Sequence, residues 1–526
     1  MRRHETMNDA FEAPRSNKWA IALTVMLPTF IEVMDTSVVN VSLPHIQGSL
    51  NAGVDESTWV LTSYLVSNAI IIPITGWLAS VFGRKRYLMF SVVVFTLSSL
   101  FCGAAPSLEV LILCRILQGL GGGGLQPLSQ AILLESFRPK EHGIAMAAFG
   151  MGVVLAPILG PVLGGWITDN WSWRWVFYIN LPAGILALFL VVLFIQDPPY
   201  LRRTHFRMDA WGLFLLTVGL GCLQVVLDKG EREDWFNSHF IVVLSIVAAL
   251  SLALFVIVEL NTEHPVVNLR VLRDRSFAAG TVIMFFGFFC LFGSIVLLPL
   301  YLQQLMGYTA LWAGLVLGPG GFASFFIMPV VGVLLKKGVK PRYLLSIGLV
   351  ATALSTWLMS GFNLQADFYT VAWPRFVQGF GMGLFFVPLA AAAYVNISRE
   401  EMGNASGIFN LLRNLGGSFG VAFSTTVLSQ RSQLHQTYLS EYITPFNAAF
   451  QTYFDQVCSW LQMNQPQASC PTGGLVMTYR EVLRQASMLA FNDAFLLLAI
   501  ATFSLLALMP LLKKSARPLG WKDGVH

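Results

Sequence analysis

The sequence predicts an all-α membrane protein with fourteen transmembrane helices. Of its 526 residues, 55% are hydrophobic and only 12% are charged, whereas a soluble domain carries about 25% charged residues. A membrane-spanning helix needs about 20 apolar residues, and fourteen stretches of the chain meet this requirement. The ten-residue alternation that is typical of barrel strands is missing. The shortage of charge excludes a soluble enzyme, a nucleic-acid-binding protein and a disordered scaffold.

The expected spans follow one another with short connections, except for a long polar segment before the last one. The first eight are expected at 19–43, 57–80, 87–105, 108–133, 143–167, 176–196, 209–228 and 239–260. The other six are expected at 277–303, 311–335, 343–361, 367–394, 403–429 and 487–511. Each boundary is expected to within about three residues.

Lysine and arginine are distributed unequally between the two sides of this arrangement. With a cytoplasmic N-terminus, the inner tails and connections hold 24 of the 33 Lys and Arg residues, and the outer connections hold 6. The remaining three lie within spans. Because cytoplasmic connections are enriched in positive residues, both termini are expected in the cytoplasm. No small-residue cleavage site follows a short apolar core near residues 1–18, so we expect no removable signal peptide.

The two halves of the sequence resemble each other. RILQGLG begins at Arg115 and RFVQGFG begins at Arg375, and in both cases a glycine follows 28 residues after the arginine. Residues 73–88 also align with residues 329–344. Parallel repeats of six spans build many secondary transporters, which bind their substrates between the halves. We therefore expect two six-helix halves with two additional helices inserted between them.

This repeat divides the chain into five parts. They are a cytoplasmic N-terminal tail (1–18), a six-helix half (19–200), an inserted helix pair with cytoplasmic linkers (201–276), a second six-helix half with an outer loop at 430–486 (277–511), and a cytoplasmic tail (512–526).

Charged residues within the spans are the main candidates for function, since each costs about 2.5–3.5 kcal/mol at the centre of a membrane helix. Glu32 and Asp35 lie three residues apart on the first span and share a face. Arg115 lies at a similar depth on the fourth span, and mutual pairing would offset much of the burial cost. We interpret Glu32, Asp35 and Arg115 as a proton-coupling cluster. Structural ion pairs that lock the helices together fit the same pattern.

The second half contains a corresponding charged set, formed by Arg375, Arg413 and Asp493. We assign Arg413 and Asp493 to a candidate substrate cavity, together with Gln118 of the first repeat motif, and regard Arg375 as structural. A carboxylate buried beside an arginine can exchange a proton near neutral pH, because burial and the nearby cation act in opposite directions. If proton release and substrate binding exclude each other, the two fluxes become coupled.

Two further motifs lie next to the expected interface between the halves. GMGVVLAPILGPVLGG (150–165) combines small residues, which allow helices to approach closely, with prolines, which bend them. It is expected to seal the interface, although ordinary close packing also explains it; its residues are Gly150, Gly152, Pro157, Gly160, Pro161, Gly164 and Gly165. The inner turn GWLASVFGRKR (76–86) is either a conformational latch or simple positive-inside anchoring; its candidate residues are Gly76, Gly83, Arg84 and Lys85.

The long outer segment contains Cys458 and Cys470, between which an oxidising exterior would permit a disulfide. Sequence spacing leaves that bond open. Residues 444–462 of the same segment are expected to form an amphipathic helix after Thr444–Pro445. No GK[ST] follows the glycine run at 119–124, and the chain contains no HExxH or paired CxxC motif. We therefore expect no cofactor, no metal and no enzymatic activity, with the proton gradient as the energy source.

Several of these motifs together resemble one protein family. GWLASVFGRKR, CRILQGLGGGG and GVVLAPILGPVLGG resemble the loop, fourth-helix and fifth-helix motifs of the major facilitator superfamily. MDTSVVNVSLP (34–44), WRWVFYINLPAG (173–184) and NLLRNLGGSFG (410–420) are similar to its fourteen-span drug:proton antiporter branch. The resemblance covers nearly the whole chain. The loop motif departs from the family pattern at Ser80, where the family usually has an aspartate, so Arg84 needs another partner.

The resemblance implies that Asp35 and Arg115 serve proton coupling and that residues 150–165 seal the path against leakage. Glu32 lies outside the shared pattern, so its assignment depends on burial alone. The implied partners are protons, amphipathic small molecules and, where the host has two membranes, a periplasmic adaptor protein and an outer-membrane channel. The implied location is the inner membrane of a bacterium.

The sequence therefore favours a proton-coupled exporter of amphipathic drugs or toxic compounds that works by alternating access. A dedicated exporter of one metabolite, fatty acid or siderophore is the main alternative, in which Arg413 would favour an anion. A membrane sensor or a lipid-modifying enzyme is a remote alternative, because no inner connection is long enough to hold a soluble domain. No nucleic-acid partner is expected.

Overall fold

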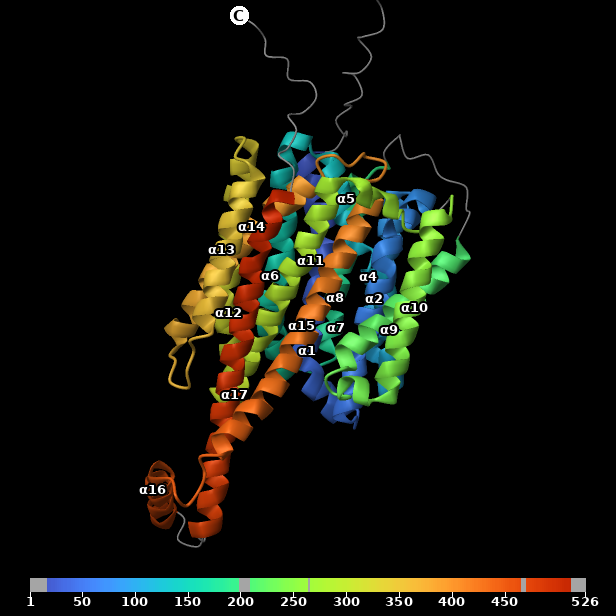
Figure 1. The fold of residues 1–526 in the computed structure, drawn as a ribbon. Helices are drawn as coiled ribbons and strands as arrows, with labels where there is room; N and C mark the ends of the chain where they lie inside the picture. Colours follow the sequence, from blue (N-terminus) through green and yellow to red (C-terminus); the bar gives the residue numbers. More distant parts are fainter. Residues whose placement is uncertain (1–16, 198–208, 264, 465–469, 512–526) are drawn as a thin grey trace, which may run out of the picture.

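The computed structural model describes residues 17–197, 209–263, 265–464 and 470–511, and it places a bundle of long helices side by side (Figure 1). No strand occurs among these residues. Residues 1–16 and 512–526 of the two expected tails, and residues 201–208 of the expected linker, lie outside the described part.

Each of the fourteen expected spans is helical, and thirteen of them are long and apolar enough, over the described residues, to cross a membrane. The first eight are α1 (Lys18–Ser49), α2 (Val54–Phe82), α3 (Arg84–Ala104), α4 (Leu108–Gly122) with α5 (Leu125–Ser136), α6 (His142–Asn170), α7 (Trp175–Tyr178) with α8 (Asn180–Phe194), α9 (Ala210–Lys229) and α10 (His239–Asn261). The next four, and the last, are α11 (Arg275–Leu300), α12 (Ala310–Lys336), α13 (Pro341–Met359), α14 (Phe368–Ala393) and α17 (Cys470–Ser504). The chain is therefore a multi-pass membrane protein.

The remaining span, α15 (Met402–Ser440), is the most polar of the long helices and passes through the bundle (Figure 1). It packs against α2, α5, α11 and α17, so protein rather than lipid surrounds much of it. Gly416 and Gly420 face the backbone of α11 at Phe285 and Phe289. Because glycine allows two helix backbones to approach closely, α15 is seated in the interior, where its polar residues can find partners.

The helices form two halves and an inserted pair. We use "first half" for α1–α8, "inserted pair" for α9–α10 and "second half" for α11–α17. The inserted pair lies at one edge of the bundle, where α9 packs against both α2 and α15 (Figure 1). Gln224 of α9 donates a hydrogen bond of 3.0 Å to Ser418 of α15, so the pair touches both halves.

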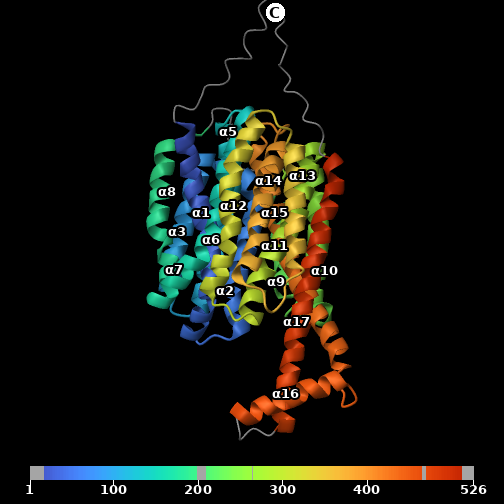
Figure 2. The same ribbon diagram turned by 90° about the vertical axis from the view of Figure 1, so that its left-hand side faces the viewer.

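The two ends of the bundle differ. The terminal end is where α1 begins and α2 meets α3, and the hairpin end is where α16 (Ala448–Asn464) projects beyond the other helices (Figure 2). At the terminal end, Lys18 and Lys336, from opposite halves, lie 2.8 and 3.5 Å from the carboxylate of Glu141. The Lys336–Glu141 pair ties the halves together at that end, and the Lys18–Glu141 pair holds Glu141 within the first half.

Glycines show how closely the halves meet at the terminal end. A Cβ atom added to Gly76 of α2 would lie 2.6 Å from the backbone of Asn404 in α15, and one added to Gly143 of α6 would lie 2.9 Å from Leu335 of α12. At the hairpin end, a Cβ atom on Gly165 or Gly318 would meet nothing within 4 Å. Close glycine contacts between the halves therefore occur at the terminal end, whereas Gly165 and Gly318 have open space around them.

The segment expected as an outer loop at 430–486 is mostly helical, which corrects the sequence prediction. Residues 421–443 contain neither glycine nor proline, so α15 continues well past the predicted boundary at 429. Beyond it lie α16, which starts close to the predicted helix at 444–462, and the first turns of α17. Cys458 and Cys470 are joined as a disulfide with their Cα atoms 5.1 Å apart, so α16 is tied to the start of α17.

The contrast between Gly76 and Gly165 predicts a difference in stability. We expect Gly76→Ala to lower the thermal unfolding temperature, because the new methyl group meets backbone that cannot move aside, and overpacking costs about 1–3 kcal/mol. The matched control Gly165→Ala is expected to be neutral or slightly stabilising, because alanine is the better helix former. Unfolding of purified protein in detergent measures both. Equal effects of the two variants would contradict the tight packing at Gly76.

Candidate functional site

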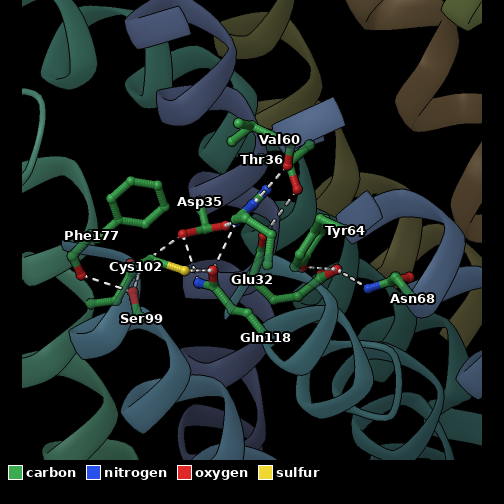
Figure 3. A network of polar contacts seen from close by, with 12 residues as sticks. Glu32, Asp35, Thr36, Val60, Tyr64, Asn68, Ser99, Cys102, Gln118 and Phe177 are labelled. Carbon is green, nitrogen blue, oxygen red and sulfur yellow. Dashed lines mark hydrogen bonds and ion pairs between the residues drawn. The ribbon is translucent and has the colours of Figure 1, made fainter. Parts of the chain in front are cut away.

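The two acids of α1 are both buried in the first half, with only 4% of Glu32 and 1% of Asp35 exposed. Asp35 accepts hydrogen bonds from Arg115 Nη1 at 2.6 Å and from Gln118 Nε2 at 3.0 Å, both on α4. A third bond of 2.7 Å comes from Asn180 Nδ2, at the start of α8. The Asp35 carboxylate is therefore held by one cation and two amides (Figure 3 draws its contact with Gln118).

Arg115 is fully buried, at 0% exposure, and is surrounded by partners from α1, α2 and its own helix α4. Its Nε donates to the carbonyl oxygen of Val60 at 3.0 Å, and its Nη1 donates to Gln118 as well as to Asp35. Its guanidinium carbon lies 4.1 Å from the ring centroid of Tyr64. A buried ion pair tolerates the loss of water only when further hydrogen bonds and ring contacts replace it, and this pair has both.

Glu32 occupies a separate, adjoining site, which corrects the prediction of a single cluster. Its Oε1 accepts hydrogen bonds from the Tyr64 hydroxyl at 3.2 Å and from Asn68 Nδ2 at 3.1 Å (Figure 3). Its Oε2 accepts one from Gln126 Nε2. Three residues of helix advance the chain by about 4.5 Å, so Asp35 reaches α4 while Glu32 reaches α2 and α5. Tyr64 connects the two sites, because its ring covers Arg115 and its hydroxyl binds Glu32.

Asn180 is a site residue that the sequence reasoning missed. Its amide nitrogen is shared between Asp35 and Ser99 Oγ, which lies 3.0 Å away, and Ser99 in turn donates to the carbonyl oxygen of Phe177 at 2.9 Å. The helix is interrupted at Ile179, between α7 and α8, and Asn180 is the first residue of α8, where its side chain reaches α1. The signal was a polar, uncharged side chain within an apolar span; the amides of Asn68 and Gln126 and the hydroxyl of Tyr64 carried the same signal.

The expected second-half set is not brought together. Arg413 of α15 is buried and donates a hydrogen bond to Gln126 Oε1 of the first half, with the ring centroid of Phe288 5.7 Å away. Asp493 instead lies 2.8 Å from His435 Nε2. His435 and Arg413 are both on α15, and at 1.5 Å per residue they lie about 33 Å apart along that helix. Gln118, assigned to the same cavity, belongs to the Asp35 site.

The repeat motif adopts similar contacts in both halves but lacks an acid in the second. Arg375 donates to Gln378, just as Arg115 donates to Gln118. Gln378 then donates to Ser294 Oγ at 2.7 Å, whereas Gln118 donates to Asp35. Among the ion pairs of the described residues, none includes Arg375. The Arg–Gln pair therefore holds a carboxylate, that of Asp35, in the first half, whereas in the second half Gln378 binds the hydroxyl of Ser294.

The turn between α2 and α3 is attached mainly to its own half. Gly83 has a φ of +87°, a backbone conformation that favours glycine. Arg84 forms a buried ion pair with Glu135 of α5, which supplies the partner that Ser80 cannot. The backbone nitrogen of Lys85 donates to Asp197 Oδ1 at 2.8 Å. Of the candidate latch residues, Gly76 is the one packed against the second half.

The glycine and proline motif of α6 has two packing partners rather than one. Gly150 faces Met328 of α12, and Pro161 lies opposite Gly314 of the same helix, so these residues meet the second half. Gly152, Gly160 and Gly164 face α1 within the first half, at Met26, Ser37 and Val38. Pro157 is exposed, and Gly165 is free of close neighbours. The motif therefore seats α6 against α1 as well as against α12.

Together, these contacts define a buried polar site that can hold a proton. Asp35 and Glu32 are ionisable groups inside an apolar bundle, and amides, a hydroxyl and arginines hold them in place. No three His, Cys, Asp or Glu side chains gather as metal ligands would in the part of the chain that is described.

Comparison with known proteins gives consistent matches. A family model described as Major Facilitator Superfamily matches residues 25–421. The multidrug export protein EmrB of Haemophilus influenzae is 39% identical over 487 residues, which cover 92% of this chain and 94% of that protein. The fatty acid resistance protein FarB of Neisseria gonorrhoeae is 38% identical over 431 residues, covering 81% and 84%. The solved proton:xylose symporter XylE shares the fold, with a TM-score of 0.57, 14% identity and coverage of 93% and 96%.

The pairing of Asp35 with Arg115 predicts strongly non-additive stability changes. We expect Arg115→Met to destabilise the protein by about 3–5 kcal/mol, because it leaves an uncompensated buried carboxylate. Adding Asp35→Asn should recover much of that loss, since the unpaired charge is removed. Unfolding in detergent for the two single variants and the double variant measures the coupling. Purely additive losses would show that the two side chains do not stabilise each other.

Proposed function

This chain belongs to the major facilitator superfamily, and from this membership we propose that it exports amphipathic drugs or toxic compounds in exchange for protons. The observation that carries the proposal is the fully buried pair of Asp35 and Arg115 inside a membrane-spanning bundle. A buried charge pair of this kind is a functional-site hypothesis by default in a membrane helix. The similarity to EmrB over nearly the whole chain supports drugs as the cargo.

In this proposal, Asp35 carries the proton. As a carboxylate it binds Arg115, Gln118 and Asn180, and protonation of one oxygen removes the charge that draws these donors to it. Its release and uptake of a proton then alternate with binding and release of the drug. One charge moved across 100 mV supplies about 2.3 kcal/mol, which is enough to drive export against a substantial gradient.

We place the protein in the cytoplasmic membrane of a bacterium, with the terminal end facing the cytoplasm. The unequal distribution of Lys and Arg supports this orientation. The disulfide of Cys458 and Cys470 lies at the opposite end, where an oxidising compartment would favour it. With this orientation, the tightly packed end of the interface between the halves closes the path to the cytoplasm.

In a host with two membranes, we propose that the hairpin end contacts a periplasmic adaptor protein, which joins the permease to an outer-membrane channel. The helices α15, α16 and α17 project well beyond the bundle (Figure 2), which favours contact with a partner over capping of the cavity. Exposed apolar side chains support such a contact: Tyr442, Phe446, Trp460 and Met463.

A dedicated exporter of one organic anion is the second candidate. Arg413 supports it, because this buried cation lies beside Phe288 and close to the interface between the halves. The similarity to FarB supports a fatty acid as the anion. The resistance profile of a deletion strain separates the two candidates. Sensitivity to many unrelated compounds favours the multidrug exporter, whereas sensitivity to a single class of acid favours the dedicated one.

The proposal predicts that drug transport and proton movement fail together when Asp35 is neutralised. In proteoliposomes that report internal pH, we expect Asp35→Asn to reduce drug-driven proton movement by more than about a hundredfold, the size of effect that a loss of 2.7 kcal/mol produces. The matched control is Asp493→Asn, because this acid lies near the hairpin end and is expected to leave coupling intact.

Glu32→Gln is the third variant of this series. Loss of coupling in both α1 variants would support two titrating acids, whereas loss in Asp35→Asn alone would make Glu32 a substrate contact. Unaltered coupled transport in both would contradict the proposed mechanism.

A further inference from the structure

Two glutamines of α5 line a polar seam between the halves. Gln130 accepts a hydrogen bond from Ser406 Oγ at 3.1 Å and another from Asn410 Nδ2. One helical turn closer to the middle of the bundle, Gln126 accepts a bond from Arg413. All three partners lie on α15 of the second half, so the seam joins α5 and α15 beside the Glu32 site.

Gln126 differs from Gln130 in its second partner. Its nitrogen donates to Glu32 of the first half, while its oxygen accepts from Arg413 of the second. A carboxylate can only accept and a guanidinium can only donate, so this orientation of the amide is required by the chemistry of the two neighbours. Gln126 thus connects the buried carboxylate of Glu32 to the buried guanidinium of Arg413 on the opposite half.

The two acids of α1 therefore differ in what holds them. The donors to Asp35, namely Arg115, Gln118 and Asn180, all belong to the first half. Glu32 takes part in no ion pair among the described residues, and its hydrogen-bonded link to a cation of the second half runs through Gln126 to Arg413. Separation of the halves would leave the partners of Asp35 in place but would remove the cation from Glu32.

We propose that Gln126 is a positioning residue that links the charge of Glu32 to closure of the terminal end, an inference that rests on the proposed exchange of protons. The Glu32 carboxylate orients the amide so that its oxygen faces Arg413, and this contact holds α15 against α5. A protonated Glu32 no longer requires that orientation, and the seam loosens. Because linkage is reciprocal, opening of the seam in turn favours the protonated form of Glu32.

The other ionisable groups near this link come from three helices of the first half and from the residue that ends α14. Tyr64 of α2, together with the neutral amide of Asn68, holds the other oxygen of Glu32. Asp35 of α1 and Arg115 of α4 form the adjoining ion pair. On the side of the second half, Tyr394, the C-cap residue of α14, interacts electrostatically with Arg413 of α15. Protonation of Asp35 would also produce a response to pH, so the test must separate the effects of the two acids.

The test measures the distance between the halves at different pH values without requiring transport. Spin labels are placed at Arg86 of α3 and Arg342 of α13, exposed positions at the terminal end that are equivalent in the repeat. Cys102, Cys114, Cys222 and Cys290 are replaced by alanine so that labelling is specific. Pulsed electron paramagnetic resonance in nanodiscs then gives the ratio of closed to open molecules between pH 5 and pH 8.

In the parent protein, we expect the ratio of closed to open molecules to fall roughly tenfold on acidification, within the range of typical coupling energies. Gln126→Met should reduce this response to less than about twofold, as should Glu32→Gln. Combining Gln126→Met with Glu32→Gln should not reduce the pH response below that of either single variant, because both changes break the same link. The matched control Gln130→Met breaks contacts of the same seam without touching Glu32, so it should shift the ratio at every pH while keeping the tenfold response.

Three outcomes would overturn the inference: no pH response in the parent protein, an unchanged response in Gln126→Met, or an equal loss of response in Gln130→Met. If Gln126→Met does not fold, Arg413→Met breaks the same link from the second half and is expected to give the same loss. Drug-driven proton movement in proteoliposomes is measured in parallel. An intact proton movement with an unchanged response in Gln126→Met refutes the link alone, whereas an absent proton movement in the parent protein refutes the proposed function.

Discussion

The burial of charge in an apolar bundle is the constraint on which this structure depends. Asp35 and Arg115 have no access to water, so each must find all of its partners within the protein. This requirement brings α1, α2, α4 and α8 together around one ion pair, and it explains why amides such as Gln118 and Asn180 lie deep inside the bundle. In the proposed exchange of protons, the donors that hold the Asp35 carboxylate are the groups that would respond when it gains a proton.

The two halves share a motif but not its chemistry. Arg115 with Gln118 and Arg375 with Gln378 form matching pairs, yet Asp35 completes the first and Ser294 the second. The acid chemistry is thus concentrated in the first half, while the second half contributes Arg413 at the interface. Gln126 connects the two halves directly, because it binds Glu32 of the first and Arg413 of the second, and in our proposal this contact links proton binding to movement of the halves.

Close packing and loose packing occur at opposite ends of the same interface. Glycines and the Lys336–Glu141 ion pair bring the halves together at the terminal end, while the hairpin end has room around Gly165 and Gly318. The inserted pair is bonded to α15 through Gln224 and packs against α2, so it spans both halves at one edge. The structure therefore combines close contacts between the halves at the terminal end with a polar seam of α5 and α15.

The sequence by itself determined the membrane class, the fourteen spans and four of the buried charged residues. Hydrophobic length and the cost of burying charge are local properties, and each can be recognised without knowing which helices are neighbours. The repeat and the family motifs were visible for the same reason, and Glu32, Asp35, Arg115 and Arg413 were all found in this way.

Only the tertiary structure decided which of these residues meet. It paired Asp35 with Arg115, assigned Glu32 to Gln126, and separated Asp493 from Arg413 by most of the length of α15. It also turned the expected outer loop into helix. Partners from different helices depend on the rotation and depth of each helix in the bundle, and a single sequence contains no direct measure of either. For that reason Asn180 and Gln126, which act through long-range contacts, could be recognised only once the helices were in place.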